Sequence, residues 1–105
     1  MDSKKVLRGR NANLPRKSDF TREFEKDWRS LQHTGINLAD LKGLMTLLVA
    51  NEGPLPPEWK DHPLKGPWTG HRECHAGGDL LVIYKLRDDN SIVFVRAGTH
   101  ADLFE

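Results

Sequence analysis

The chain has 105 residues and carries 16 lysines and arginines against 15 aspartates and glutamates, which gives a formal net charge of +1. This length allows one domain with one modest core. The single cysteine, Cys74, excludes an intrachain disulfide, and no apolar run approaches the ~20 residues that a membrane-spanning helix needs.

The balanced total hides a difference between the two halves of the chain. Residues 1–50 contain ten basic and six acidic side chains, whereas residues 51–105 contain six basic and nine acidic ones. The basic half is suited to contact a polyanion while the acidic half carries the chemistry, although charges of this number commonly do no more than solvate a surface. Without a disulfide or an apolar secretory signal, we expect a soluble protein in the reducing cytoplasm.

The N-terminal segment, residues 1–12, is polar and basic, which predicts a mobile tail in front of a single domain over residues 13–105. Within that domain, the segment 14–20 is predicted to form a short edge strand. Pro15 favours this assignment because proline is tolerated at the start or the edge of a sheet.

The first helix is predicted to begin after Thr21, which has the N-cap position. Phe24, Trp28 and Leu31 follow with helical spacing and form one apolar stripe. Gly35 is a usual C-terminal signal, so we expect the helix to end before it.

A second helix is predicted from Asn37 to Ala50. Ile36 and Leu41 have the spacing of a hydrophobic staple across its start, and Gly53 with the prolines that follow it ends the helical pattern. Two consecutive helices with a short connection predict an antiparallel pair.

From Trp59 onward the pattern is that of strands. Residues 68–76 alternate and break at a Gly-Gly turn, and residues 79–87 form a near-continuous apolar run, as expected of a central strand covered on both faces. A polar turn and a third strand over 91–97 follow. The order predicts an α+β domain in which two antiparallel helices pack on a small, mainly antiparallel sheet of one edge strand and a three-stranded meander.

Four of the five histidines lie between positions 62 and 100. If residues 68–76 form a strand, His71, Glu73 and His75 project from one face, while Arg72 and Cys74 project from the other. Such a run, exposed in a concave sheet, supplies acids and bases near neutral pH. Side chains from other segments are expected to reach the same place: His62, Asp79, Arg96 and His100.

Each candidate also has a plainer interpretation. A single histidine on a strand is more often a surface residue than a catalyst, and Arg96 suits a cross-strand ion pair as well as a phosphate. Phe94 and Tyr84 are expected in the core. Histidine and carboxylate side chains also form zinc sites, but the sequence has neither an HExxH helix nor a CxxC pair. Convergence of several titratable side chains favours a catalytic pocket, and we predict no metal or other cofactor.

Three blocks of sequence resemble the signature segments of the YafQ branch of the RelE-type toxins, within the RelE/ParE toxin–antitoxin superfamily. They are DHPLKGPWTGHRECH (61–75), DLLVIYKL (79–86) and RAGTHADLF (96–104). The segment LADLKGLMTLLVANEGPLP (38–56) is similar to the second helix of that family, and SDFTREFEKD (18–27) is similar to its first helix more loosely. The resemblance covers about residues 14–105.

The resemblance implies a RelE-like fold and the toxin of a type II toxin–antitoxin system, a metal-independent endoribonuclease that cleaves mRNA in the ribosomal A site. It also implies a DinJ/RelB-like antitoxin as partner, with operator DNA bound only through the antitoxin complex. By resemblance, the catalytic set is His62, Glu73, His75, Asp79 and His100. The same resemblance makes Arg96 the phosphate-facing arginine and Phe104 the terminal aromatic, and we add His71 as a substrate contact.

RNA carries its own nucleophile, the 2′-hydroxyl, so a catalyst must remove that proton and protonate the departing 5′-oxygen. We expect two of the three histidines at 62, 75 and 100 to do this. The chain departs from the family pattern at Glu73, His71 and Leu80, where the family has aspartate, tyrosine and an aromatic residue. Two alternatives remain: a binding module of the same fold that acts without cleavage through antitoxin, operator DNA or ribosome, and a metal-dependent hydrolase.

Overall fold

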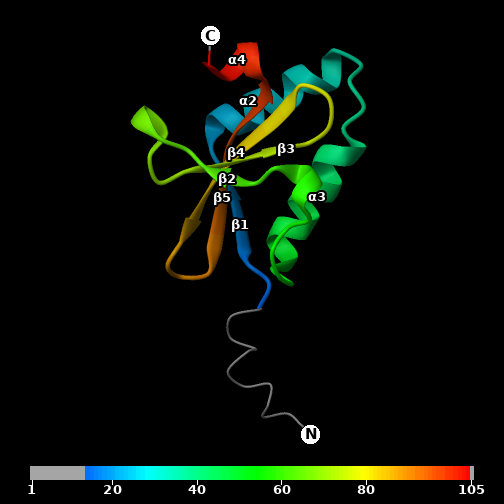
Figure 1. Ribbon diagram of the computed structural model, residues 1–105. Helices are drawn as coiled ribbons and strands as arrows, with labels where there is room; N and C mark the ends of the chain where they lie inside the picture. Colours follow the sequence, from blue (N-terminus) through cyan, green and yellow to red (C-terminus); the bar gives the residue numbers. More distant parts are fainter. Residues whose placement is uncertain (1–13, 105) are drawn as a thin grey trace, which may run out of the picture.

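The structure is a computed structural model that describes residues 14–104, and the predicted tail over 1–12 lies outside this range (Figure 1). It opens with strand β1 (Lys17–Phe20) and helix α2 (Arg22–His33). The predicted N-cap is confirmed, because Thr21 Oγ1 accepts a hydrogen bond from the backbone N–H of Phe24 at 3.0 Å. The same hydroxyl donates to the carbonyl of Val95 at 2.7 Å, which joins the start of α2 to the sheet.

Helix α3 (Ala39–Ala50) begins slightly later than the sequence predicts. Asn37 lies before the helix, and its side-chain oxygen accepts from the backbone N–H of Ala39 at 2.8 Å. The helix ends at Asn51, which adopts the left-handed conformation that closes many helices. None of the helices in the described range is both long enough and apolar enough to cross a membrane.

The second half of the chain forms most of a five-stranded sheet with strand order β1-β5-β4-β3-β2. Its elements are η1 (Pro57–Trp59), β2 (His62–Pro63), η2 (Gly66–Trp68), β3 (Arg72–His75), β4 (Leu80–Arg87), β5 (Ser91–Thr99) and the short helix α4 (His100–Phe104). Strand β1 runs parallel to β5, and the other neighbouring strands are antiparallel. The predicted α+β class and meander are confirmed.

Several strand boundaries differ from the prediction. The strand expected over 68–76 is restricted to 72–75, because the residues before it form the 3₁₀ turn η2. The last strand extends to Thr99, and a bulge next to Ile83 and Tyr84 shifts its register against β4. Strand β2 and helix α4, which the periodicity of the sequence did not predict, complete the fold at the two ends of this half.

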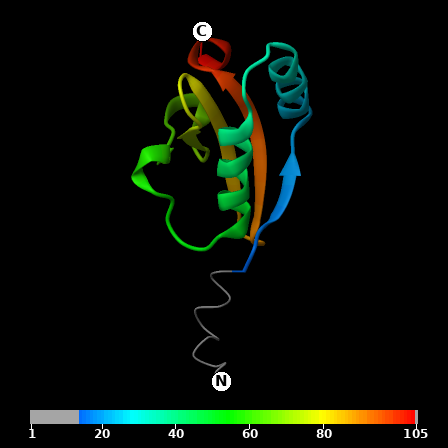
Figure 2. The same ribbon diagram turned by 90° about the vertical axis from the view of Figure 1, so that its right-hand side faces the viewer.

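The sheet has a helical face, covered by α2 and α3, and an outer face, next to η2 and α4 (Figures 1 and 2). Alternate residues of β4 pack on opposite faces, so that Val82 and Tyr84 contact the core under the two helices, whereas Leu81 and Ile83 pack with Leu103 of α4. Strand β4 is therefore covered on both faces, as its apolar run predicts.

Candidate active site

Three titratable side chains meet on the outer face, and we call them the Glu73 cluster: His62, Glu73 and His75. The pairing of β2 with β3 places His62 opposite Glu73, and His75 lies two positions further along the same face of β3. Oε1 of Glu73 is 3.4 Å from Nε2 of His62 and 3.6 Å from Nε2 of His75. One carboxylate therefore serves two imidazoles.

The members of the Glu73 cluster differ in their access to solvent. The side chain of Glu73 is 8% exposed, whereas those of His62 and His75 are 45% and 36% exposed. A carboxylate that is withdrawn from water requires polar partners, and here the partners are two rings that a bound molecule can reach. Because imidazole both gives and takes protons near neutral pH, the arrangement can exchange protons with a substrate on this face.

The backbone before β2 sets the orientation of the His62 ring. Lys60 has a left-handed conformation with φ of 51°, and its carbonyl oxygen lies 2.7 Å from Nδ1 of His62. Because a carbonyl only accepts hydrogen bonds, Nδ1 is the nitrogen that carries a hydrogen. Nε2 is the nitrogen of His62 that faces Glu73.

Directly behind the Glu73 cluster, on the helical side, four residues form what we call the Asp61 network: Asp61, Arg72, Cys74 and Tyr84. The Asp61 carboxylate accepts hydrogen bonds from Arg72 Nε and Nη2 at 3.2 and 3.1 Å, from Cys74 Sγ at 3.4 Å and from the Tyr84 hydroxyl. Burial raises the pKa of Asp61, but hydrogen bonds from Arg72, Tyr84 and Cys74 outweigh it, and the pKa lies below its ordinary value.

The prediction that Arg72 and Cys74 point away from Glu73 is confirmed by this network, and Tyr84 is buried as expected. The pKa values of Tyr84 and Cys74 lie well above their ordinary range. Burial is the larger cause, and the neighbouring Asp61 carboxylate adds to it. The sequence analysis predicts no role for Asp61, although this residue is next to the candidate histidine His62 in the segment 61–75. Its alternation with His62 was the available signal.

A second group of rings lies on the outer face, and we call it the aromatic row: His71, Trp68, Phe104 and His100. The successive ring centroids are 5.3, 6.3 and 5.0 Å apart. Helix α4 supplies the last two members, so the predicted residues Phe104 and His100 stand together. His71 lies on the same outer face as Glu73, as predicted, but it precedes β3, and its ring packs on the edge of Trp68.

Within residues 14–104, neither Arg96 nor Asp79 forms a hydrogen bond or an ion pair with the Glu73 cluster. Arg96 Nε and Nη2 donate to the two carboxylate oxygens of Asp27 at 2.7 and 3.1 Å, and Asp27 raises the pKa of Arg96. The ion pair that the sequence left open is therefore present, but it reaches helix α2 and not a neighbouring strand. Asp79 is exposed in the turn before β4, and it makes no ion pair with another described residue.

The Glu73 cluster also meets the geometric requirement of a metal site. One ligand atom from each of its three residues lies within 4.8 Å of the others. Two imidazole nitrogens and a carboxylate oxygen are a common ligand set for zinc and related divalent ions. The residues therefore fit such an ion as well as they fit proton transfer.

Comparison with known proteins gives one family and several solved structures. A family model described as "Bacterial toxin of type II toxin-antitoxin system, YafQ" matches residues 16–105. The chain is 43% identical to the mRNA interferase toxin YafQ of Escherichia coli K12 over 91 residues, which is 87% of this chain and 98% of that protein.

Two solved structures are similar over most of the chain. The toxin in the crystal structure of the E. coli DinJ-YafQ complex has a TM-score of 0.79 and 43% identity, with 86% of this chain and 99% of that chain covered. A metal-bound toxin from Helicobacter pylori has a TM-score of 0.75 and 37% identity, with 84% and 98% covered.

Proposed function

This chain belongs to the YafQ family of bacterial toxins of type II toxin–antitoxin systems, and we propose that it is an mRNA interferase, an endoribonuclease that cleaves mRNA on the outer face of its sheet. The observation that carries the proposal is the Glu73 cluster, in which two exposed imidazoles share one buried carboxylate. Such an arrangement is suited to acid–base chemistry on RNA and requires no cofactor.

In the proposed reaction the 2′-hydroxyl of one nucleotide attacks the adjacent phosphorus. An imidazole beside Glu73, either His62 or His75, takes the hydroxyl proton, because the carboxylate stabilises the imidazolium that forms. His100, presented by α4, returns a proton to the departing 5′-oxygen. The bond between phosphorus and the 5′-oxygen breaks, and the products are a 2′,3′-cyclic phosphate and a 5′-hydroxyl.

The remaining candidates receive supporting roles. Phe104 stacks on a base, a contact worth about 1–3 kcal/mol in single-strand recognition, and His71 contacts the same strand from the other end of the aromatic row. Arg96 binds a phosphate by exchanging its partner Asp27 for the phosphate oxygens, which charge and bidentate geometry favour. Asp79, which is exposed in the turn between β3 and β4, assists proton removal.

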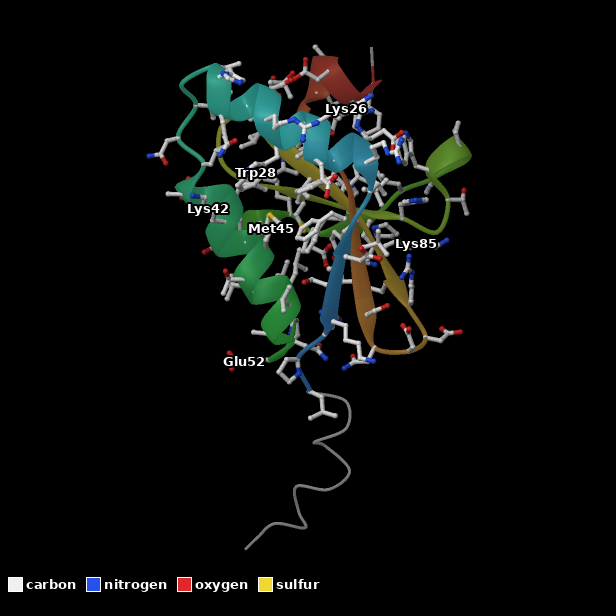
Figure 3. The ribbon with its side chains drawn as sticks, turned by 180° about the vertical axis from the view of Figure 1, so that it is seen from behind. Lys26, Trp28, Lys42, Met45, Glu52 and Lys85 are labelled. Carbon is white, nitrogen blue, oxygen red and sulfur yellow. The ribbon has the colours of Figure 1, made fainter. Side chains whose placement is uncertain are left out.

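We further propose that the message is cut in the ribosomal A site in the cytoplasm, and that an antitoxin similar to DinJ holds the toxin inactive and carries it to operator DNA. The E. coli relative crystallises with DinJ. In this chain the helical face offers a docking surface, because Phe20 is 43% exposed there. Lysines at the margin, Lys26 and Lys42, suit an acidic chain that folds on binding (Figure 3).

Single histidine variants test the proposed chemistry. His75→Ala and His100→Ala are each expected to lower the rate of mRNA cleavage on programmed ribosomes by about 10²–10⁴-fold, because each removes one proton-transfer partner. His33→Ala is the matched control, since His33 lies in the last turn of α2, and it should cleave at the parent rate. Cleavage by both site variants at the parent rate would show the assignment to be wrong.

A second function is favoured by the spacing of the same three ligand atoms. If a divalent ion is the catalyst, His62, Glu73 and His75 hold it, and the ion supplies a Lewis acid at the phosphate. The two functions differ in their response to chelation: the acid–base nuclease keeps its activity in EDTA, whereas a metal-dependent hydrolase loses it. A message left whole by the pure protein under both conditions would identify a binding module.

A further inference from the structure

The short strand β2, which carries His62, has little backbone pairing of its own. It contains only His62 and Pro63, at the edge of the sheet. Proline has no N–H to donate to a neighbouring strand, and the next backbone bond, from Leu64 to the carbonyl of His71, lies beyond the strand. Backbone pairing alone therefore leaves the position of His62 weakly defined.

The Asp61 network supplies the attachment that the backbone lacks. The donors to Asp61 come from two other strands, with Arg72 and Cys74 on β3 and Tyr84 on β4. Tyr84 is 2% exposed and Cys74 is fully buried, so their positions are fixed by the core. A carboxylate held by several donors of fixed position is itself fixed, and so is the backbone that continues into His62.

The network and the Glu73 cluster stand back to back across the same strands. Asp61 and His62 are consecutive, and their side chains point to opposite sides of the sheet. The same is true of Arg72 and Glu73 on β3, where Arg72 bonds to Asp61 and Glu73 faces His62. The bond from Arg72 to Asp61 on one side therefore sets the register that brings His62 within 3.4 Å of Glu73 on the other.

We propose that Asp61 is a positioning residue of the nuclease: its bonds to Arg72 and Tyr84 hold β2 so that Nε2 of His62 stays at the Glu73 carboxylate. This inference rests on the proposed function for its effect on cleavage. Asp61 does not touch the RNA or any reacting atom, and it acts only through the place that it gives to His62. Small displacements of a proton-transfer group are costly, since about 1 Å can reduce a rate about 10²-fold.

The kinetic test uses three variants of the network. Asp61→Ala should reduce the single-turnover cleavage rate at saturating toxin about 10²-fold, while the half-saturating toxin concentration changes less than about 2-fold, because RNA contacts are retained. Asp61→Asn keeps an acceptor for the tyrosine hydroxyl and should fall between Asp61→Ala and the parent. Tyr84→Phe, which removes one donor and keeps the ring, should slow cleavage about 5-fold or more.

A destabilised control separates positioning from stability. Leu44→Ala truncates a fully buried side chain under the helices, and we compare all variants at a temperature where circular dichroism shows them folded. Equal slowing by Leu44→Ala, or a parent rate for folded Asp61→Ala, contradicts the proposal. If Asp61→Ala does not fold, Tyr84→Phe decides, and its cleavage at the parent rate contradicts the proposal.

A measurement without RNA distinguishes this proposal from the proposed function. In NMR spectra of the free protein, the ring signals of His62 should move in Asp61→Ala while those of His33 stay unchanged. Unmoved His62 signals would overturn the positioning role. If the signals move but His62→Ala and His75→Ala both cleave at the parent rate, the positioning holds and the proposed chemistry fails.

Discussion

Glu73 is the residue whose environment is most specific, because both of its ion pairs with described residues are to histidines. We predict that Glu73→Gln lowers mRNA cleavage by about 10²-fold while the fold is kept, since the amide retains the shape of the side chain but cannot stabilise a neighbouring imidazolium. Cleavage of a reporter mRNA on ribosomes, with circular dichroism of the same sample, measures both effects. An active Glu73→Gln protein would remove the carboxylate from the mechanism.

Asp61 gives a prediction about stability and pH. Its folded-state pKa lies below the ordinary value, which is about 3.9 for a free aspartate. The contribution of Asp61 to the free energy of unfolding is therefore fully present above that value. It is lost as the pH falls through the lower, folded-state pKa. Urea unfolding should be measured between about pH 6 and pH 3, a range that includes the ordinary value of about 3.9. The free energy of unfolding should fall more steeply toward acid pH for the parent than for Asp61→Asn. Parallel curves would contradict this role of the Asp61 carboxylate.

Single residues also show how far sequence reasoning reaches. Alternation along β3 was sufficient to place Glu73 and His75 on one face, because strand geometry is local. The partner of Arg96 is Asp27, 69 residues away, and no local pattern reports such a tertiary contact. No periodic signal showed that the strand begins only at Arg72, after the 3₁₀ turn η2, so that His71 lies in front of it.

Among the elements, helix α2 is joined to the sheet mainly at its first turns. Thr21 caps the helix and bonds to Val95, and Asp27 accepts the backbone N–H of Ala97 at 2.9 Å. We predict that Thr21→Ala costs about 1 kcal/mol of stability through the lost cap, which lowers the melting temperature by about 4–8 °C in a domain of this size. Calorimetry measures the shift, and cleavage per folded molecule should be unchanged. A melting temperature equal to that of the parent would contradict the role of this cap.

Helix α4 has a sequence signal at its start, although the helix is too short to show a periodic pattern. The helix has only five residues. Thr99 and Asp102 have the spacing of a capping box. In the structure the Thr99 N–H donates to Asp102 Oδ2 at 3.0 Å, and the Asp102 N–H donates to Thr99 Oγ1 at 3.2 Å. This local pair fixes the start of the helix that carries His100 and Phe104.

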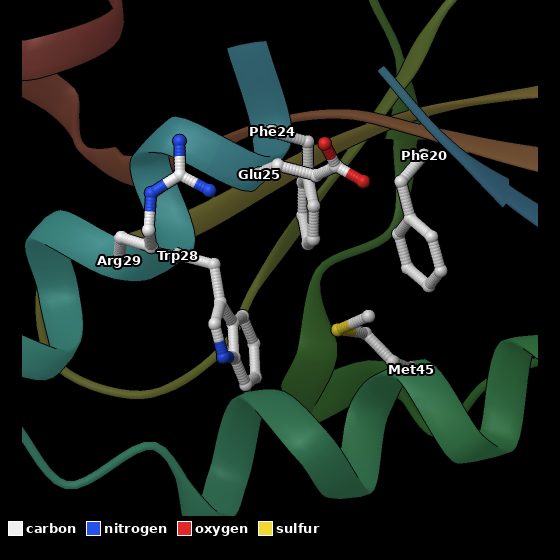
Figure 4. Close-up of a pocket in the computed structure, with 6 residues that line it drawn as sticks. All are labelled: Phe20, Phe24, Glu25, Trp28, Arg29 and Met45. Carbon is white, nitrogen blue, oxygen red and sulfur yellow. The ribbon is translucent and has the colours of Figure 1, made fainter. Parts of the chain in front are cut away.

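The two faces of the sheet carry different surfaces, an apolar groove on one and the candidate active site on the other. The helical face has a groove of about 450 Å³ between α2 and α3, into which Phe20, Trp28 and Met45 project (Figure 4). The outer face carries the Glu73 cluster and the aromatic row. Binding to the antitoxin and cleavage are therefore expected to be separable by mutation.

Met45→Asp tests this separation. We expect it to weaken antitoxin binding at least about 10-fold, because it places a charge in an apolar groove, and to leave cleavage on ribosomes unchanged. Calorimetric titration with the purified antitoxin provides the affinity, and Lys85→Asp, on strand β4, is the control for an added negative charge. Undiminished binding by Met45→Asp would move the antitoxin to another surface.

The overall architecture was accessible from sequence to a large extent. Helical spacing, caps and the apolar run of β4 sufficed for the α+β class, and the likeness to the E. coli toxin confirms the RelE-like fold. The parallel pairing of β1 with β5 depends on contacts between the first and last thirds of the chain, so local pattern could not establish it. Strand β2 is too short to give a periodic signal and depends on Asp61 side-chain bonds.

In the proposed reaction the scissile phosphate lies on the outer face, between the Glu73 cluster and His100. The most direct measurement is a structure of the toxin on a programmed ribosome whose mRNA carries a 2′-O-methyl group at the cleavage site, which blocks the nucleophile. We predict that the blocked 2′-oxygen lies within about 2.6–3.2 Å of Nε2 of His62 or His75, with the leaving 5′-oxygen facing His100. An mRNA bound across the helical face, with these histidines distant from any phosphate, would rule out this reaction.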